Sequence, residues 1–381
     1  MNAPNKYNIL SSDDPKNIVL FYPHIPKKAV DYVNDTLHSR WIGQGPKVEL
    51  FEQKFYQRFT APNISLTVGS GTDALHLSYI LAGLKEGDEV IAPVFTCMAT
   101  NIPLLYIGAK IKFADIQLNT LNIDPKHVAQ LVNENTKAIV CVHYGGLPCD
   151  MIELQSIAEK WNIPIIEDAA HAIGAKYQDK SIGSISDFTT FSFQGIKHIT
   201  TGDGGMIALK DNKLMDKAKR IRWFGIDRSM RQLGLWENDI SEIGYKYQMT
   251  DISAAMGLAA MEEIEDTLAL RKQLFNEYEK RLKNIPGVQF LGAGYTDREH
   301  AAWLCTIVAE KRSELQNKLL ENKIESKQVH YRNDRYSIFG GRQNNLTNMD
   351  LIEDKYLVLP MHTKIIIEQV EKVCSVIKSG W

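Results

Sequence analysis

The sequence predicts an α/β fold, in which a mostly parallel sheet lies between two layers of helices as an α/β/α sandwich and a smaller C-terminal α+β domain follows. From about Pro46, short apolar and β-branched runs alternate with longer stretches of helical period, which is typical of a parallel sheet wrapped by helices. After Tyr247 the pattern changes to a long, charged and amphipathic stretch, which predicts one long helix leading out of the sheet domain. We therefore expect a large domain over residues 1–254 and a small domain over residues 255–381.

The strands expected in the large domain are mostly apolar, as strands covered on both faces are. They cover residues 64–68, 89–94, 110–116, 137–144, 163–168, 186–193 and 204–210. Helices are expected between these strands, for example after Thr72 and Thr96, whose hydroxyls can cap a helix start. In the small domain, we expect strands over 301–309 and 323–331 and helices over 313–322 and 365–377.

The composition excludes several classes of protein. Lysine and arginine number 44 against 46 aspartate and glutamate, a formal net charge of -2, which supplies no positive field for nucleic acid or an anionic membrane. The five cysteines include no C-x-x-C pair, so neither a disulfide framework nor a metal site is expected. There is no signal-like start, and no window reaches the ~18 apolar residues of a membrane span. We expect a cytoplasmic protein.

One lysine, Lys197, stands in the loop SFQGIKHITTGDGG (192–205), between an apolar strand and a run of small residues. Small residues let a planar ligand lie against the backbone. A lysine amine is a strong nucleophile toward carbonyl carbons once it is deprotonated, and burial lowers its pKa toward neutrality. A lysine alone is most often a solvated loop residue, so the interpretation of Lys197 depends on its neighbours.

The segment IPIIEDAAHAIGA (163–175) ends a buried strand with an acidic pair. Ligands of open α/β sheets bind beyond the carboxyl ends of the strands, so Asp168 is expected to point into the site. There a carboxylate can keep a pyridine nitrogen protonated; alternatively, Glu167 or Asp168 only caps the following turn. His171 is either a hydrogen-bond partner of a ligand's phenolic oxygen or a core histidine.

The segment TVGSGTDALHLS (67–78) joins a strand to a helix through a turn that contains Gly69 and Gly71. The first amides of such a helix, together with its dipole, can hold an anion such as a phosphate monoester. The segment has neither G-x-G-x-x-G nor G-K-[ST], the patterns of a dinucleotide fold and a P-loop. The functional prediction therefore depends on the combination of an anion cradle, an acid at a strand end and a loop lysine.

Together these segments resemble the DegT/DnrJ/StrS sugar aminotransferases, a family with the fold-type I architecture of the pyridoxal phosphate enzymes. The resemblance extends over nearly the whole chain, from WIGQGPKVELFEQKF (41–55) to LPMH (359–362), and its most specific segments are EDAAHA and the lysine loop. It implies pyridoxal phosphate as the cofactor and a homodimer whose active sites are shared between subunits.

The resemblance also implies roles for individual residues. Lys197 and Asp168 are the implied catalytic residues, Lys197 as the internal aldimine and Asp168 as the contact of the pyridine nitrogen. The implied cofactor-binding residues are Gly71, Thr72, Cys97, Asp168, His171, Ser192, Lys197 and Lys246, and the candidate substrate contacts are His330, Tyr331 and Arg332.

Two positions depart from the family pattern. Cys97 stands where the family often has an aromatic residue that stacks on the cofactor ring, so another residue stacks there or a thiol packs that face. Lys246 stands where many members have an asparagine that reaches across the dimer interface to the phosphate. A lysine serves the same anion as a point charge, or it is a plain surface residue.

The implied activity is transfer of an amino group from glutamate to a keto-sugar, by way of pyridoxamine phosphate. A nucleotide-linked keto-sugar is the expected acceptor, as in polysaccharide or lipopolysaccharide biosynthesis, and a free keto-sugar acid or a small phosphorylated ketone needs nearly the same groups. Some dehydratases of the family have histidine in place of the aldimine lysine, so Lys197 favours transamination. Two other classes stay open: a nicotinamide-dependent oxidoreductase, disfavoured by the missing G-x-G-x-x-G, and a non-catalytic regulatory relative.

Overall fold

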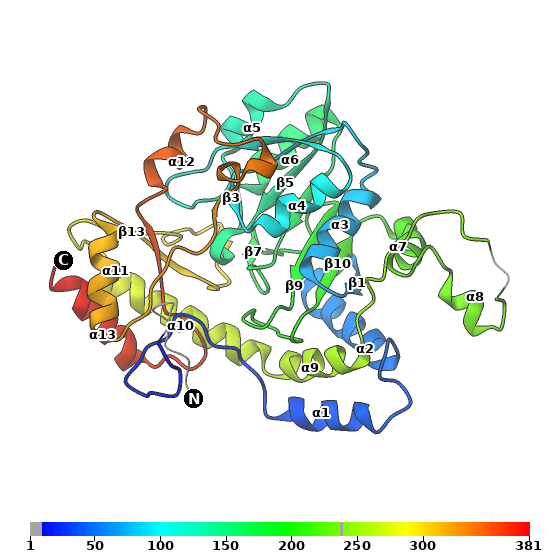
Figure 1. Ribbon diagram of the computed structural model, residues 1–381, viewed down its shortest axis with the longest axis horizontal. Coiled ribbons are helices and arrows are strands. Elements are labelled where there is room, and N and C mark those ends of the chain that lie inside the picture. Colours follow the sequence, from blue (N-terminus) through cyan, green and yellow to red (C-terminus); the bar gives the residue numbers. More distant parts are fainter. Residues whose placement is uncertain (1–9, 237–238) are drawn as a thin grey trace.

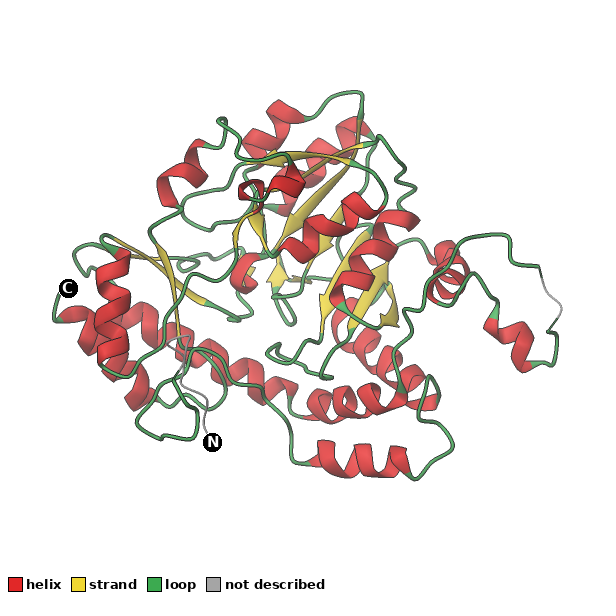
Figure 2. Cartoon of the chain, viewed as in Figure 1, coloured by secondary structure: helices red, strands yellow, loops and turns green. Residues whose placement is uncertain are grey.

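The structure, a computed structural model, describes residues 10–236 and 239–381. At its centre is a seven-stranded sheet with the strand order β1-β10-β9-β6-β5-β2-β4 (Figures 1 and 2). Strand β10 runs antiparallel to both of its neighbours, β1 and β9, whereas β9, β6, β5, β2 and β4 form a continuous parallel ladder. The strands are β1 (Ile64–Val68), β2 (Glu89–Pro93), β4 (Lys110–Ala114), β5 (Thr136–Val142), β6 (Ile165–Asp168), β9 (Phe188–Ser192) and β10 (Gly205–Leu209). The predicted mostly parallel sheet is confirmed, with strand ends that differ by a few residues.

Helices cover both faces of the sheet. Since successive residues of a strand point to opposite faces, each strand contributes side chains to both layers. In β5, Ile139 and Cys141 enter one core cluster, while Ala138 and Val140 enter the other. The first cluster is closed by α2 (Pro46–Phe55), α5 (Pro125–Leu131), α6 (Met151–Trp161) and α9 (Asp251–Glu262), and the second by α3 (Gly71–Leu81), α4 (Met98–Tyr106) and α7 (Met215–Arg222). The predicted α/β/α sandwich is therefore confirmed.

The prediction of one long helix after Tyr247 is wrong in one respect. The segment forms two helices, α9 and α10 (Ile264–Leu282), separated at Glu263, whose φ of -106° and ψ of 8° are not helical. Helix α9 packs in the first core cluster, and α10 begins in the same cluster with Ile264 and Leu268 before it enters the C-terminal core. Helix α9 packs closely on α2, where a Cβ on Gly257 would lie 2.8 Å from the Phe51 ring, whereas α10 buries Leu274 and Tyr278 in the C-terminal core.

The C-terminal part contains a three-stranded antiparallel sheet of β11 (Val288–Phe290), β13 (Cys305–Ala309) and β15 (Tyr356–Leu359), flanked by α10, α11 (Arg312–Glu321) and α13 (Ile367–Lys378). The expected strand 301–309 begins only at Cys305. The expected strand 323–331 is wrong, because the segment forms no continuous ladder with this sheet. Lys327 makes one isolated bridge to Val358 of β15, and Ile324 makes another to Ile18.

Chain segments cross between the two expected domains. Ile18, near the N-terminus, is buried in the C-terminal core, and the short strand β14 (Tyr331–Arg332) pairs with β3 (Phe95–Thr96) beside the large sheet. The expected boundary near residue 255 falls within α9 and stays a prediction. No helix in the described part of the chain is both long and apolar enough to cross a membrane.

Candidate active site

A cavity of about 430 Å³ lies at the carboxyl ends of β6 and β9, where ligands of open α/β sheets bind. Residues from the C-terminal part of the chain, including Trp303 and Val329, close it from the other side. The sequence-predicted residues that line this cavity are Gly71, Thr72, Cys97, Asp168, His171, Ser192, Lys197 and His330. The fold thus brings together segments that are more than two hundred residues apart in the chain.

Lys197 lies in the turn after β9, and only 9% of the residue is exposed. Its Nζ atom lies 3.7 Å from the ring centre of Trp303. Burial lowers the pKa of this amine to about 8, against the opposing effects of Asp168 and Cys97, and the charge of Arg271 adds to the lowering. About a tenth of an amine is unprotonated one unit below its pKa, so Lys197 has a nucleophilic fraction near neutral pH.

Asp168 is the last residue of β6 and is 5% exposed. Its Oδ1 accepts a hydrogen bond from the Ala170 backbone N–H at 3.0 Å, and its Oδ2 accepts one from Thr100 Oγ1 at 2.7 Å. One oxygen therefore caps the following turn, as the alternative interpretation proposed, while the residue also lines the cavity. Two fixed donors hold the carboxylate in one orientation toward any ring bound there.

Glu167, the other acid of the pair, points away from the cavity because neighbouring residues of a strand alternate sides. Its Oε2 forms a 2.7 Å ion pair with His143 Nε2, and both side chains are fully buried. Its Oε1 accepts hydrogen bonds from the Ser186 backbone N–H and from Thr189 Oγ1. Glu167 is therefore a structural acid, and Asp168 alone of the pair faces the cavity.

The start of α3 lies beside the cavity, where the sequence predicts an anion cradle. Ser70 caps the helix by accepting a hydrogen bond from the Asp73 N–H at 3.0 Å. The contact between this helix start and the end of β9 is close, since a Cβ on Gly71 would lie 2.9 Å from Ser192 Cβ. The exposed amides of the first turn and the Ser192 hydroxyl thus share one small space, whose size requires glycine at position 71.

Two histidines and one tryptophan form a stack beside Lys197. The rings of His171 and Trp303 lie 3.9 Å apart at 15°, and His330 lies 5.2 Å from His171 at 10°. The Gly145 N–H donates to His171 Nδ1, so the neutral ring carries its proton on Nε2, 3.3 Å from His330 Nε2. Burial lowers the pKa of both imidazoles, that of His330 to about 3, so both are neutral at physiological pH.

Trp303 is the site residue that sequence reasoning missed. The run AAWLCTIVA (301–309) predicts only a strand, because an apolar run does not show which of its residues faces a cavity. Cys97 stands at the N-cap of α4 and lines the cavity, and so do the aromatic residues Phe21, Phe191 and Trp303. Which side chain stacks on a bound ring stays a prediction.

Three predicted residues lie outside the cavity lining. Lys246 bridges to the Trp223 backbone, and its Nζ lies 5.4 Å from the Phe224 ring centre. Tyr331 is 39% exposed, and the Arg335 guanidinium lies 4.7 Å from its ring centre. The predicted role of Lys246 is a contact with the cofactor phosphate across a subunit interface. The position of Lys246 within one chain does not test this role, which stays a prediction.

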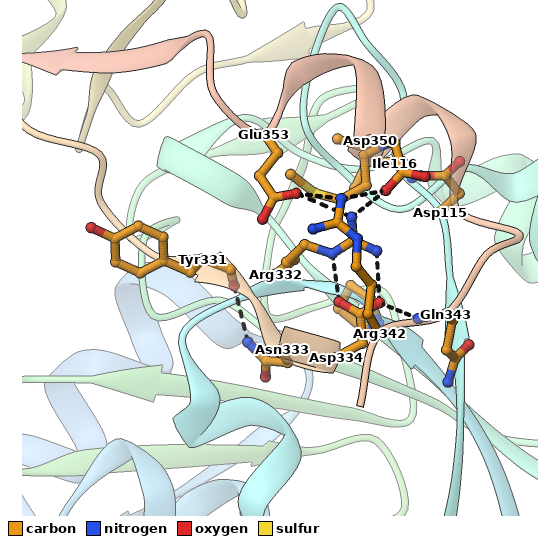
Figure 3. Close-up of polar contacts among 12 residues, drawn as sticks. Asp115, Ile116, Tyr331, Arg332, Asn333, Asp334, Arg342, Gln343, Asp350 and Glu353 are labelled. Carbon is orange, nitrogen blue, oxygen red and sulfur yellow. Dashed lines mark hydrogen bonds and ion pairs between the residues drawn. The ribbon is translucent and has the colours of Figure 1, made fainter. Parts of the chain in front are cut away.

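Arg332 is fully buried, and its donors are directed to acids (Figure 3). It forms a bidentate pair with Asp334 at 2.6 and 2.7 Å and further ion pairs with Asp350 and Glu353. Arg342 forms ion pairs with Asp350 and Glu353 from the solvent side. These contacts attach α12 (Thr347–Ile352) to β14 and argue against the predicted substrate contact of Arg332.

The cavity fits the cofactor that the sequence implies. It combines a buried amine, a carboxylate at a strand end and a glycine-dependent anion cradle, which suit the aldehyde, ring nitrogen and phosphate of pyridoxal phosphate. Gly71, Thr72 and Ser192 would hold the phosphate, and Asp168 would face the ring nitrogen. Within residues 10–236 and 239–381, no group of three or more His, Cys, Asp or Glu side chains is placed to hold a metal ion.

Comparison with known proteins gives the family. The model of the DegT/DnrJ/EryC1/StrS aminotransferase family matches residues 23–378. The chain belongs to this family. Aminotransferases of this family depend on pyridoxal phosphate, and one solved relative, Spr1654 from Streptococcus pneumoniae, has been determined in pyridoxal and pyridoxamine phosphate forms. The predicted enzyme class and cofactor are thereby confirmed at the level of the family.

Further relatives include a named synthase and two proteins of known structure. A GDP-perosamine synthase of Escherichia coli O157:H7 is 37% identical over 320 residues, covering 83% of this chain and 85% of that protein. The structure of AtS13 from Actinomadura melliaura superimposes with a TM-score of 0.91 at 33% identity, covering 96% of this chain and 99% of that one. Spr1654 in its pyridoxamine phosphate form gives a TM-score of 0.89 at 30% identity, covering 95% and 98%. The predicted fold-type I architecture is therefore confirmed.

Proposed function

We propose that the protein is a sugar aminotransferase that moves an amino group from glutamate to a nucleotide-linked keto-sugar. The observation that carries the proposal is the buried amine of Lys197 in one cavity with the Asp168 carboxylate and the α3 anion cradle. The relation to a GDP-perosamine synthase supports a nucleotide-linked acceptor. A cytoplasmic location stays a prediction of the sequence.

The side chains of the cavity would have two roles, to hold the cofactor and to transfer protons. When bound, pyridoxal phosphate supplies the electron sink and, in its pyridoxamine form, the carrier of the amino group. Lys197 would hold the cofactor covalently and, once released, its amine would move a proton from the donor's α-carbon to the C4′ carbon of the cofactor. In the second half-reaction the same amine would move a proton from C4′ back to the carbon of the acceptor. Asp168 would keep a positive charge at the ring nitrogen, and Trp303 and His330 would line the opposite side of the cavity.

His330 is the predicted substrate contact that the cavity retains. Its Nε2 faces His171 Nε2 at 3.3 Å, and since His171 carries its proton there, His330 Nε2 accepts it. The remaining proton of the neutral His330 ring is on Nδ1. We therefore assign His330 Nδ1–H as the donor to a hydroxyl or phosphate oxygen of the acceptor.

The experiment replaces Lys197 with alanine in the full chain loaded with pyridoxal phosphate. We expect loss of glutamate-dependent amination and of the borohydride-stable cofactor label on the peptide that contains residue 197. Lys180→Ala is the matched control, because Lys180 is exposed and lies outside the cavity. Amination that survives in Lys197→Ala, or a label on another lysine, would reject the proposal.

We also propose that the active unit is a homodimer with shared sites. The segment around α8 (Arg228–Gln232) stands away from the body of the molecule (Figure 1). Along it Leu233, Trp236 and Ile243 are 76%, 65% and 81% exposed, an apolar surface that a monomer rarely presents. Lys246 lies at the base of this segment, where a second subunit would bring it to the neighbouring cradle.

A mixing experiment tests the shared site. Lys197→Ala and Lys246→Ala chains are unfolded, mixed in equal amounts and refolded together. If Lys246 serves the partner's site, each mixed dimer contains one intact site, and about a quarter of the wild-type activity returns. Activity that stays at the level of the separate variants, or a fully active monomer in sedimentation velocity, would contradict the shared site.

A further inference from the structure

Near Lys197 lies a buried arginine that has no acidic partner among the described residues. Arg271, on α10, is 3% exposed. Its Nη1 donates to three backbone oxygens, those of Ala302, Trp303 and Met361, at 3.5, 3.3 and 3.1 Å, while its Nε has no partner. Burial lowers the pKa of this guanidinium to about 10 with no opposing contribution from an acid of the described chain, so it stays charged at neutral pH.

The turn that Arg271 holds is unusual in its backbone. Ala302 has a φ of 53°, in the left-handed region that is unfavourable for a residue with a Cβ. The turn is fastened from several sides, because His198 Nε2 lies 2.8 Å from the Ala301 oxygen and the Trp303 N–H donates to the Gly145 oxygen at 2.9 Å. A turn held this firmly fixes the direction of the next side chain, Trp303.

Trp303 in turn holds the Lys197 segment at two points. Its indole N–H donates to the Ile196 backbone oxygen at 3.2 Å, and its ring lies under the Lys197 amine. Contacts therefore connect Arg271 to Lys197 continuously. The Arg271 guanidinium donates to carbonyl oxygens of the turn, the turn carries Trp303, and the Trp303 indole contacts the Lys197 amine.

We infer that Arg271 is a positioning residue for amino transfer: through the 300–304 turn it places Trp303 against Lys197. The inference rests on the proposed role of Lys197. The charged and titratable groups around the amine come from several elements. Asp168 and Cys97 favour protonation, Arg271 opposes it, and His171, His198 and His330 are held neutral by burial.

The test measures the protonation of Lys197 directly in the full chain freed of cofactor. Trace acetic anhydride labels unprotonated amines, and mass spectrometry of the Lys197 peptide across a pH series gives the labelling midpoint, with exposed Lys180 as internal reference. Arg271→Gln keeps a donor for the carbonyls but removes the charge. We expect its Lys197 midpoint to rise by roughly 0.5–1 unit, a three- to tenfold slower labelling at pH 7.

Arg271→Lys is the matched control, because it keeps the charge; its midpoint should stay within about 0.2 unit of the wild-type value. An unchanged or lower midpoint in folded Arg271→Gln overturns the inference. Arg271→Met is a second neutral variant, because it removes the charge and keeps a long side chain; an unchanged or lower midpoint in folded Arg271→Met also overturns the inference. The labelling reports the protonation of Lys197 and does not depend on turnover. Amination by Lys197→Ala therefore tests the proposed function, and the Lys197 midpoint in Arg271→Gln separately tests the role of Arg271.

Discussion

Replacing Arg332 with methionine tests whether this residue holds the structure or binds substrate. The substitution removes a fully buried guanidinium and leaves Asp334, also fully buried, with only the Gln343 N–H among the partners that Figure 3 shows. Breaking one side of a buried ion pair costs about 3–5 kcal/mol, because the remaining charge has no counterion. We therefore expect the free energy of unfolding to fall by about that amount.

Two controls separate the charge from other effects. Arg342→Met removes the outer arginine of the same cluster, whose side chain is 54% exposed, and exposed pairs contribute about 0–1 kcal/mol. The double variant Arg332→Met with Asp334→Asn removes both buried charges and should recover at least half of the lost stability, since replacing a whole buried pair is often nearly neutral.

The assay is urea unfolding followed by circular dichroism, with amination rates measured in the folded range. We expect a large loss of stability in Arg332→Met, a small one in Arg342→Met, and nearly unchanged kcat/KM in the double variant. Equal loss of stability in the two single variants would refute the buried-charge argument. A normal unfolding midpoint with abolished amination would instead assign Arg332 to the substrate.

Two further predictions concern the cofactor. Gly71→Ala places a Cβ 2.9 Å from Ser192 Cβ, and we expect the dissociation constant for pyridoxal phosphate to rise about tenfold; an unchanged titration would contradict the close fit. The rate of covalent attachment to Lys197 in cofactor-free protein depends on the unprotonated amine, whose pKa is about 8. The rate should therefore rise about tenfold per unit below pH 8 and level off above it, and a rate independent of pH would show that another group limits attachment.

Local patterns were sufficient to predict the sheet and part of the site. The strands of the large sheet are mostly apolar and β-branched, so their positions can be read from the local sequence. The long helix was different: the non-helical backbone at Glu263 divides it into α9, which packs in the first core cluster, and α10, which reaches from that cluster into the C-terminal core. The expected strand at 323–331 failed because its pairing depends on distant residues: the segment makes single bridges to Ile18 and to Val358 of β15 in place of a continuous ladder.

The sequence by itself determined the chemistry of the site: the lysine loop, the acid at the end of a strand and the glycine turn before a helix are short motifs whose function depends on adjacent residues. Only the tertiary structure decided which long-range partners complete them. It placed Trp303 rather than Arg332 against the cavity, paired Arg332 with three acids, and left Arg271 charged behind the amine. The physical reason is that burial and charge pairing depend on residues far away in the chain, whereas strand and turn propensities depend on neighbours.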